Sequence, residues 1–368
     1  MATKLPLRPA DDHKRHTPLT SASADPDKTR AKWRAQHRED IIDPALPIID
    51  PHHHLWVRPG NHYLVQDFMA DAKSGHNIRA SVYVDCGSFY RKSGPVEMQC
   101  VGEVEFANGM AAMAASGFFG DTLMCAGIVG TADISVGAEC GAVLDALTAA
   151  GGGTNGRFRG IRVTTKWDAD EDLNTGRYIV PRHLMADSQF REGFAELGKR
   201  GLNFDAMIYH PQLPELADLA RAFPGTPIIV NHIGGLIAHT RTYTAKKDEA
   251  IAMWKKGITE LAACPNVYVK LGGLGMPYLG MGLDKLPVPA SSKTLAQAWG
   301  SFYGHCIEAF GSSRCMFESN FPPDRDSVDY PVIWNTFKRI AAQYSASEKH
   351  ELFFGTANRV YRLGVGLK

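Results

Sequence analysis

From Pro47 onward, short apolar segments alternate with longer helix-like segments, and this alternation restricts the fold more than any other feature of the sequence. The apolar segments are rich in β-branched residues or almost continuously apolar, which is typical of parallel strands buried on both faces. Eight segments have this character. The predicted strands are residues 47–50, 80–85, 123–129, 158–163, 203–208, 227–231, 267–271 and 315–319.

Helical periodicity fills most of the intervals between these segments. The predicted helices are residues 101–116, 136–150, 188–199, 213–222, 248–263 and 291–310. A strand followed by a helix, repeated eight times, is the pattern of a (β/α)₈ TIM barrel. A doubly wound open sheet is the alternative, but no G-x-G-x-x-G turn follows the first strand. We therefore expect a single α/β barrel domain over residues 46–368.

Residues 1–45 form an N-terminal extension that differs from the rest of the chain. They are rich in Lys, Arg, Asp, Ser, Thr and Pro, with little apolar periodicity before Ile41. We expect a polar arm that is either loose or draped over the barrel or a neighbouring subunit, as in a homo-oligomer. A transit segment is disfavoured because such segments avoid acidic residues, and this one carries Asp11, Asp12, Asp25 and Asp27.

Charge and composition exclude several classes of protein. The chain has 40 Lys+Arg against 39 Asp+Glu, a net charge of +1, so it lacks the basic excess that nucleic acids or anionic membranes attract. No apolar run reaches the length of a membrane helix, and the first residues lack a secretory apolar region. Its seven cysteines form no C-x-x-C pair, which indicates reduced thiols. We expect a cytoplasmic protein whose partner is a small-molecule substrate.

The strongest chemical signal is Asp50-Pro51-His52-His53-His54, at the end of the first strand. Residues two apart share a face of an extended strand, so His52 and His54 are predicted to point together into the barrel mouth. Two adjacent imidazoles supply half of a divalent-metal site. Asp50 has the same parity and is expected to orient one of the ligands. The alternative is a histidine cluster packed in a polar pocket.

Three later strand ends carry further candidates. His232 follows the sixth strand and precedes Gly234-Gly235, which suits a ligand or an acid/base group beside a tight turn. His210 follows the fifth strand and is equally compatible with a site residue or a core histidine. The eighth strand ends in a segment that contains Glu318 and Asn320.

Together, D-x-H-x-H at residues 50–54, N-H-I-G-G at 231–235 and F-x-S-N-F-P at 317–322 resemble the amidohydrolase superfamily. The similarity is to its amidohydrolase-2 branch of TIM-barrel hydrolases, which contains sugar lactonases and 2-pyrone-4,6-dicarboxylate lactonases and has decarboxylases of aromatic acids as relatives. It extends from about Ile48 to Leu363. The resemblance implies hydrolysis of a cyclic ester, with His52, His54 and His232 as metal ligands; a metal-free mechanism also exists in this branch.

One departure from the family pattern concerns the catalytic base. The family's strand-eight position is normally Asp, and here it is Asn320, an amide that cannot accept a proton at neutral pH. Asn320 can therefore only ligate a metal through its carbonyl oxygen or form a hydrogen bond to substrate. Glu318, two residues earlier on the same face, is the first candidate base; Asp324 and a histidine, His232 or His210, are the alternatives.

The resemblance also indicates substrate contacts. Arg162, in a Gly-Ile-Arg segment, matches an arginine that faces substrate in these lactonases, where it would bind a carboxylate in a bidentate manner. Tyr83 and Trp56 are expected to line the pocket. Additional positive charge is predicted from Lys166, Arg177 and Lys270. The long segments 168–181 and 272–292 are predicted to cover the site.

These observations predict a hydrolase that opens a lactone of a small carboxylate-bearing or sugar-derived substrate. Water attack would be assisted by histidines and by a divalent metal, zinc ahead of manganese because the ligands are imidazoles. The alternatives are a non-oxidative decarboxylase of an aromatic acid, a non-catalytic binding barrel, and a hydrolase of amides or other esters.

Overall fold

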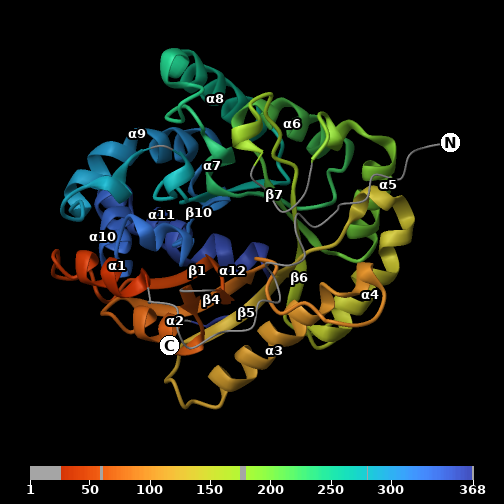
Figure 1. Ribbon diagram of the computed structural model, residues 1–368, viewed down its shortest axis with the longest axis horizontal. Coiled ribbons are helices and arrows are strands. Elements are labelled where there is room, and N and C mark those ends of the chain that lie inside the picture. The colour runs from red at the N-terminus through yellow and green to blue at the C-terminus, as the bar shows by residue number, and fades with distance from the viewer. Residues whose placement is uncertain (1–25, 59–60, 175–179, 280, 367–368) are drawn as a thin grey trace.

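The computed structural model describes residues 26–58, 61–174, 180–279 and 281–366, and its main sheet contains eight parallel strands that follow one another in chain order (Figure 1). All eight coincide with predicted strands to within a few residues. The strands are β1 (Pro47–His53), β4 (Asn77–Val84), β5 (Leu123–Gly130), β6 (Phe158–Thr164), β7 (Asn203–Met207), β8 (Ile228–Val230), β9 (Val267–Leu271) and β10 (Cys315–Phe317).

The first and last strands meet just beyond their carboxyl ends. His53 and Phe321 form a parallel bridge, and the Phe321 carbonyl accepts a hydrogen bond from the backbone N–H of His54 at 2.8 Å. The N–H of Asn320 donates to the carbonyl of His52 at 3.0 Å. The predicted (β/α)₈ barrel is thus confirmed, and its closing seam lies at the histidine cluster.

Most of the helices surround the sheet as an outer ring (Figure 1). The helices of the described residues are α1 (Pro26–Arg34), α2 (Val65–Ala72), α3 (Val101–Ala115), α4 (Gly141–Ala150), α5 (Ser188–Lys199), α6 (Leu213–Ala222), α7 (His232–Gly235), α8 (Lys247–Ala262), α9 (Ser292–Phe310), α10 (Tyr330–Ile340), α11 (Ala346–His350) and α12 (Thr356–Val360). The predicted helix at 136–150 begins later than expected: Gly137 has a φ of 72°, so residues 134–140 form a kinked 3₁₀ segment and α4 starts at Gly141.

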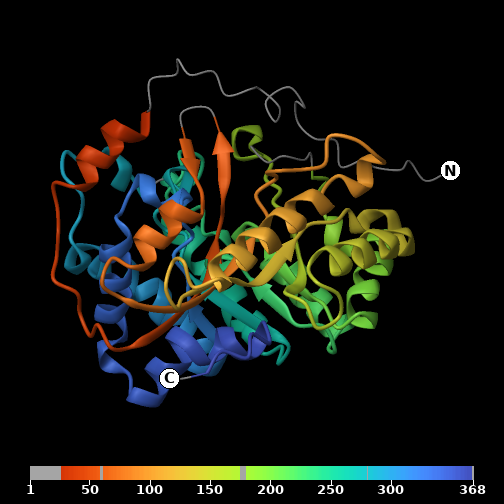
Figure 2. The ribbon, with the colours of Figure 1, turned by 90° about the horizontal axis from the view of Figure 1, so that it is seen from below.

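Two apolar layers hold the barrel together. The larger lies between the strands and the outer helices, and the smaller fills the barrel interior. In the interior, Ile49 and Met316 pack with Val360 and Tyr361, which belong to or follow α12. The last helices therefore close one end of the barrel. The β2–β3 hairpin (Trp56–Arg58 and Asn61–Tyr63) rises at the opposite end (Figure 2).

The described part of the N-terminal arm, residues 26–45, packs on its own chain. The indole N–H of Trp33 donates to the Leu286 carbonyl at 2.8 Å. The carboxylate of Glu39 accepts the backbone N–H of Ser292 at 2.7 Å. This part is thus draped over the barrel, which is one of the two expected arrangements, while residues 1–25 lie outside the described residues.

Within the described part of the chain, no helix is both long enough and apolar enough to cross a membrane. The seven cysteines are all buried free thiols, as their spacing predicted.

Candidate active site

A bulge at the end of β1 decides where the histidines point. Asp50 pairs with Ser81 and His53 pairs with Tyr83, so β1 advances three residues while β4 advances two. The extra residue reverses the alternation of side chains. His53 consequently faces the outer layer, where its Nε2 lies 2.9 Å from the Ser81 hydroxyl. His52, next to it, points toward the barrel axis.

Because of this bulge, Asp50 and His52 lie on opposite faces of β1, so the predicted role of Asp50 was wrong. Its side chain is on the outer side of the strand, where Oδ2 accepts hydrogen bonds from the hydroxyls of Ser319 at 2.5 Å and Tyr330 at 3.0 Å. Oδ1 accepts the backbone N–H of Ser319 at 3.0 Å. Burial raises the pKa of Asp50 to about 6, although these hydrogen bonds act to lower it. Asp50 therefore fixes the β1–β10 seam and orients no imidazole ring.

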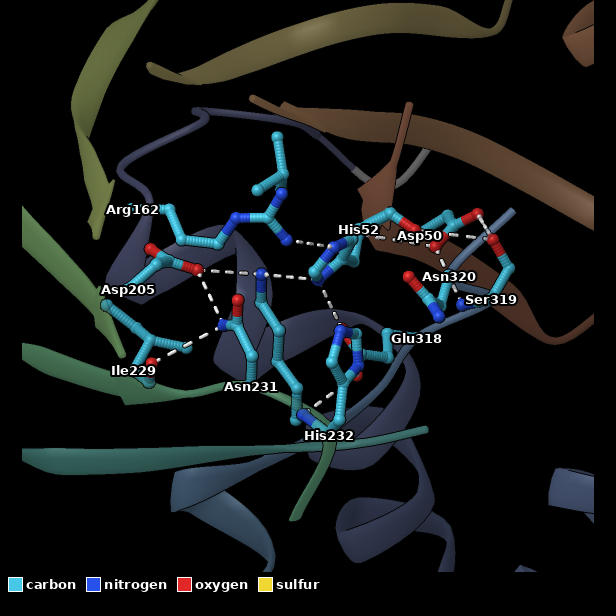
Figure 3. Close-up of polar contacts among 12 residues, drawn as sticks. Asp50, His52, Arg162, Asp205, Ile229, Asn231, His232, Glu318, Ser319 and Asn320 are labelled. Carbon is cyan, nitrogen blue, oxygen red and sulfur yellow. Dashed lines mark hydrogen bonds and ion pairs between the residues drawn. The ribbon is translucent and has the colours of Figure 1, made fainter. Parts of the chain in front are cut away.

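Glu318 links two histidines that come from different strands. Its Oε1 lies 2.6 Å from Nδ1 of His232, and its Oε2 lies 2.7 Å from Nδ1 of His52 (Figure 3). All three side chains are almost completely buried. The contact to His52 has the distance of an ion pair but lacks the alignment of a hydrogen bond, so Oε2 has no hydrogen-bond donor.

Backbone geometry makes room for this group. His232 and Ile233 have φ angles of 54° and 51°, so the chain turns sharply as β8 ends. A Cβ on Gly273 would lie 2.6 Å from the His232 ring, and one on Gly272 would lie 2.3 Å from Cγ of Glu318. The glycine pair after β9 thus permits the close approach of His232 and Glu318.

His54 is oriented by a single bond. Its Nδ1 lies 2.7 Å from the carbonyl of Val84, which can only accept, so Nδ1 carries the proton. The other nitrogen, Nε2, therefore has a free lone pair, and it lies 3.2 Å from Nε2 of His52.

A buried ion pair supports the histidines from inside the barrel. Nζ of Lys270 donates to Oδ1 of Asp205 at 2.8 Å and lies 3.3 Å from Nδ1 of His52. The same Asp205 oxygen accepts from the Asn231 amide at 3.0 Å and the Tyr361 hydroxyl at 2.8 Å. Lys270 was predicted to add charge at the barrel mouth; instead it is fully buried and paired.

Burial keeps the imidazoles of this group neutral. Burial, with Lys270 and His232 nearby, lowers the pKa of His52 well below its usual value. The pKa of His54 is also far below normal, through burial and then Arg162. Burial lowers the pKa of His232 too, although Glu318 opposes the shift. Neutral imidazoles present the lone pairs that a metal requires.

Asn320 bridges the seam and Asp324. Its Nδ2 donates to Oδ1 of Asp324 at 2.8 Å, and its buried Oδ1 has no partner. Oδ2 of Asp324 accepts the N–H of Gly275 at 3.3 Å. Both oxygens of Asp324 thus accept hydrogen bonds, which weakens its candidacy as a base.

A pocket of about 420 Å³ opens above this group. It lies at the carboxyl end of the strands, as expected for a barrel of this type. Trp56, Arg162 and Asn320, all expected at the pocket, do line it. Its described lining residues are His54, Trp56, Arg58, Asn61, Cys86, Arg162, Lys166, Met207, His232, Met276, Pro277, Tyr278, Asn320, Pro322, Pro323 and Asp326.

Two other predicted residues, Tyr83 and His210, are placed differently. Tyr83 lies outside the pocket, because it is on the helix-facing side of β4, where its hydroxyl donates to Glu103 at 2.8 Å. His210 is fully buried beside Tyr243, neither ring nitrogen has a partner, and burial lowers its pKa to about 4. It does not line the pocket. Arg177 lies outside the described residues.

Two functional neighbours were not predicted from the sequence. Asp85 holds Arg162, with Oδ1 2.8 Å from Nε and its backbone carbonyl accepting from Nη2. Asp205 anchors Lys270. A charged residue at an inward position of a barrel strand was the available signal for Asp205, because such a charge needs a buried partner.

The donor set fits a divalent metal ion. One ligand atom from each of His52, His232 and Glu318 lies within 4.8 Å of the other two. Two imidazoles and one carboxylate are an established ligand set for zinc, and the donorless Oε2 of Glu318 is the buried atom that a cation would satisfy. His54, predicted as a ligand, is outside this set of three.

Comparisons with known proteins agree on the family. A family model described as amidohydrolase matches residues 49–363. An uncharacterized protein of Sinorhizobium fredii, y4mH, is 31% identical over 340 residues, which cover 86% of this chain and 99% of that protein. An L-fucono-1,5-lactonase of Burkholderia multivorans is 28% identical over 184 residues, or 50% of this chain and 58% of that enzyme.

Solved structures share the fold. An amidohydrolase from Burkholderia multivorans with bound Zn matches with a TM-score of 0.65 at 22% identity, covering 86% of this chain and 99% of that one. A 5-carboxyvanillate decarboxylase from Novosphingobium aromaticivorans, complexed with manganese, matches with a TM-score of 0.53 at 12% identity, covering 87% and 97%.

Proposed function

Because this chain belongs to the amidohydrolase family, we propose that it is a hydrolase that opens a lactone in the pocket at the carboxyl end of the barrel. The observation that carries the proposal is the position of Glu318 between His52 and His232, directly beneath the pocket. A carboxylate held between two neutral imidazoles can accept a proton from water beside a bound ester. The partial similarity to L-fucono-1,5-lactonase supports an ester substrate.

Glu318 acts as the proton acceptor. Its Oε1 is held by the ring and the backbone N–H of His232, at 2.6 and 3.2 Å. Its Oε2 has no donor and, in the metal-free reaction, takes the proton from the attacking water; with a metal ion bound, the same oxygen would be a ligand instead. Returning this proton to the ring oxygen of the opened ester completes the hydrolysis.

The pocket walls position the ester and the water. The unpartnered Oδ1 of Asn320 accepts a hydrogen bond from the water or from a substrate hydroxyl. Arg162 is held by Asp85 through Nε and Nη2, so its Nη1 is directed toward His52 and the pocket. There it stabilises the negative charge that develops on the carbonyl oxygen.

His52, His232 and Glu318 would hold a divalent metal ion, for which zinc is our choice. When bound, such an ion polarises a carbonyl and lowers the pKa of a coordinated water. The proposal for zinc rests on the His₂Glu donor set.

A pH-indicator assay tests the function. Purified protein is mixed with a panel of lactones and of aromatic acids, with and without chelator, and the release of acid and of CO₂ is followed. Release of acid that is lost in Glu318→Gln supports lactone hydrolysis. If CO₂ is released from an aromatic acid while no lactone opens, the reaction is decarboxylation. If neither occurs after zinc is added back, the protein is not a hydrolase of this kind.

A further inference from the structure

The pocket walls carry more positive than negative side chains. Arg58, Arg162 and Lys166 line it, and Asp326 is the single acidic residue among the described lining residues. An excess of positive charge in a partly dry cavity attracts anions. The three cations differ in the contacts that they already make within the protein. The cation with the fewest such contacts is the one most available to a ligand.

Two of the three cations are already held by the protein. Arg162 is paired with Asp85, which takes up Nε and Nη2. The guanidinium of Arg58 stacks over the Trp56 ring, 3.8 Å from its centroid, and donates to the Cys86 carbonyl at 3.3 Å. Their charges are therefore partly satisfied before any ligand arrives.

Lys166 is different. It follows β6, and its Nζ lies 5.3 Å from the ring centroid of Tyr209 and 5.1 Å from that of Tyr278. In the part of the chain that the structure describes, no carboxylate forms an ion pair with it. The nearby Asp168 is occupied by the Tyr243 hydroxyl at 2.7 Å. A partly buried ammonium without an acceptor is costly, and an anionic ligand removes that cost.

The size of the pocket suits a small ligand with two polar ends. Lys166 and His232 line the same pocket. A pocket of about 420 Å³ is of the size that holds a small molecule. An ester at His232 and an acid group at Lys166 can thus belong to the same molecule.

We propose that the substrate is a lactone that carries a carboxylate, and that Lys166, between Tyr209 and Tyr278, binds this carboxylate. The inference rests on the proposed function and narrows it: neutral sugar lactones become the poorer substrates. The two tyrosine rings hold the ammonium in place by cation–π attraction, so its position is set before the ligand binds.

Binding is measured first, by calorimetry at pH 7, with pyridine-2,4-dicarboxylate and its uncharged diamide as probes. The wild-type protein should bind the dicarboxylate at least tenfold more tightly than the diamide. Lys166→Gln should weaken dicarboxylate binding by roughly 10–100-fold, because a charge-assisted bond is lost. Lys166→Arg, which keeps the positive charge, should lose less affinity for the dicarboxylate than Lys166→Gln. Lys285→Gln, an exposed control outside the pocket, should bind as the wild type does.

Equal binding of the dicarboxylate by the wild type and Lys166→Gln, or equal binding of dicarboxylate and diamide, overturns the inference. Turnover is then measured on a lactone carboxylate and on its neutral amide. Equal kcat/KM for both overturns the inference but leaves lactone hydrolysis standing. Dicarboxylate binding that depends on Lys166, with no turnover of any lactone, confirms the anion site and rejects the proposed hydrolysis.

Discussion

Nζ of Lys270 lies 2.8 Å from Oδ1 of Asp205, and both side chains are fully buried in the barrel interior. Removing one partner of such a pair leaves an uncompensated buried charge. We expect Lys270→Met to lower the free energy of unfolding by about 3–5 kcal/mol, as measured by urea denaturation. The double variant Lys270→Met/Asp205→Asn should lose less free energy of unfolding than the single variant Lys270→Met. A double variant as unstable as the sum of both single variants would contradict this account.

Glu318→Gln should abolish proton acceptance while keeping the side-chain shape. We expect kcat on a lactone to fall by about 10²–10⁴-fold, the usual contribution of a general base. The circular dichroism spectrum and Tm should show that the barrel still folds. Glu105→Gln, an exposed residue paired with Arg91, is the matched control and should retain full activity. Unchanged turnover in Glu318→Gln would remove this residue from the mechanism.

Asn320→Asp, which restores the residue usual in the family, should destabilise this protein. The Asn320 amide donates to Asp324 at 2.8 Å, and a carboxylate in its place would repel that oxygen. The free energy of unfolding should fall by about 1.5–3 kcal/mol at pH 8. This loss should diminish toward pH 5, because the two carboxylates then share a proton and the shared pKa is raised in the folded state.

The swapped variant, Asn320→Asp with Asp324→Asn, reverses donor and acceptor and should recover most of the stability. Urea midpoints at pH 5 and pH 8 measure both effects. A pH-independent loss in Asn320→Asp would show that charge repulsion is not the cause.

The dependence of activity on alkaline pH should report Lys166. Burial, and then Arg162, lowers the pKa of Lys166 to about 8. Its positive charge is complete below this pH and is lost above it, so kcat/KM on a lactone carboxylate should fall as the pH rises through 8. Initial rates are corrected for spontaneous hydrolysis. In Lys166→Gln, kcat/KM should be lower at neutral pH and should not decline as the pH rises through 8. If the variant shows the same decline, another group causes it.

Metal binding can be measured apart from activity. We expect the purified protein to contain about one equivalent of a divalent ion by elemental analysis. Adding zinc to the chelated protein should raise Tm, because a ligand that binds only the folded state stabilises it. His232→Ala, which removes one of the three donors, should lose both the metal and the Tm response. A metal-free protein with full lactonase activity would reject the metal proposal.

Much of this architecture could be predicted locally. Val267–Leu271 was predicted with its observed bounds, because an apolar run between helical segments needs no distant information to be recognised. Helix α5 was also predicted with its observed bounds, and the structure shows that the side chain of Asp187 caps it by accepting from the N–H of Phe190 at 3.0 Å. Parallel strands in a closed barrel bring their carboxyl ends together, and this rule placed His232 and Glu318 near His52.

The sequence by itself thus determined the order of strands and helices and which strand ends carry polar groups. Only the tertiary structure decided the directions of those groups. The bulge after Asp50, which turns His52 inward, arises from the pairing of β1 with β4, and that register depends on contacts across the sheet. Likewise, Lys270 is neutralised by Asp205, 65 residues away in the chain. Partners this far apart in the chain are brought together by packing in three dimensions, so they cannot be predicted from a local pattern of residues.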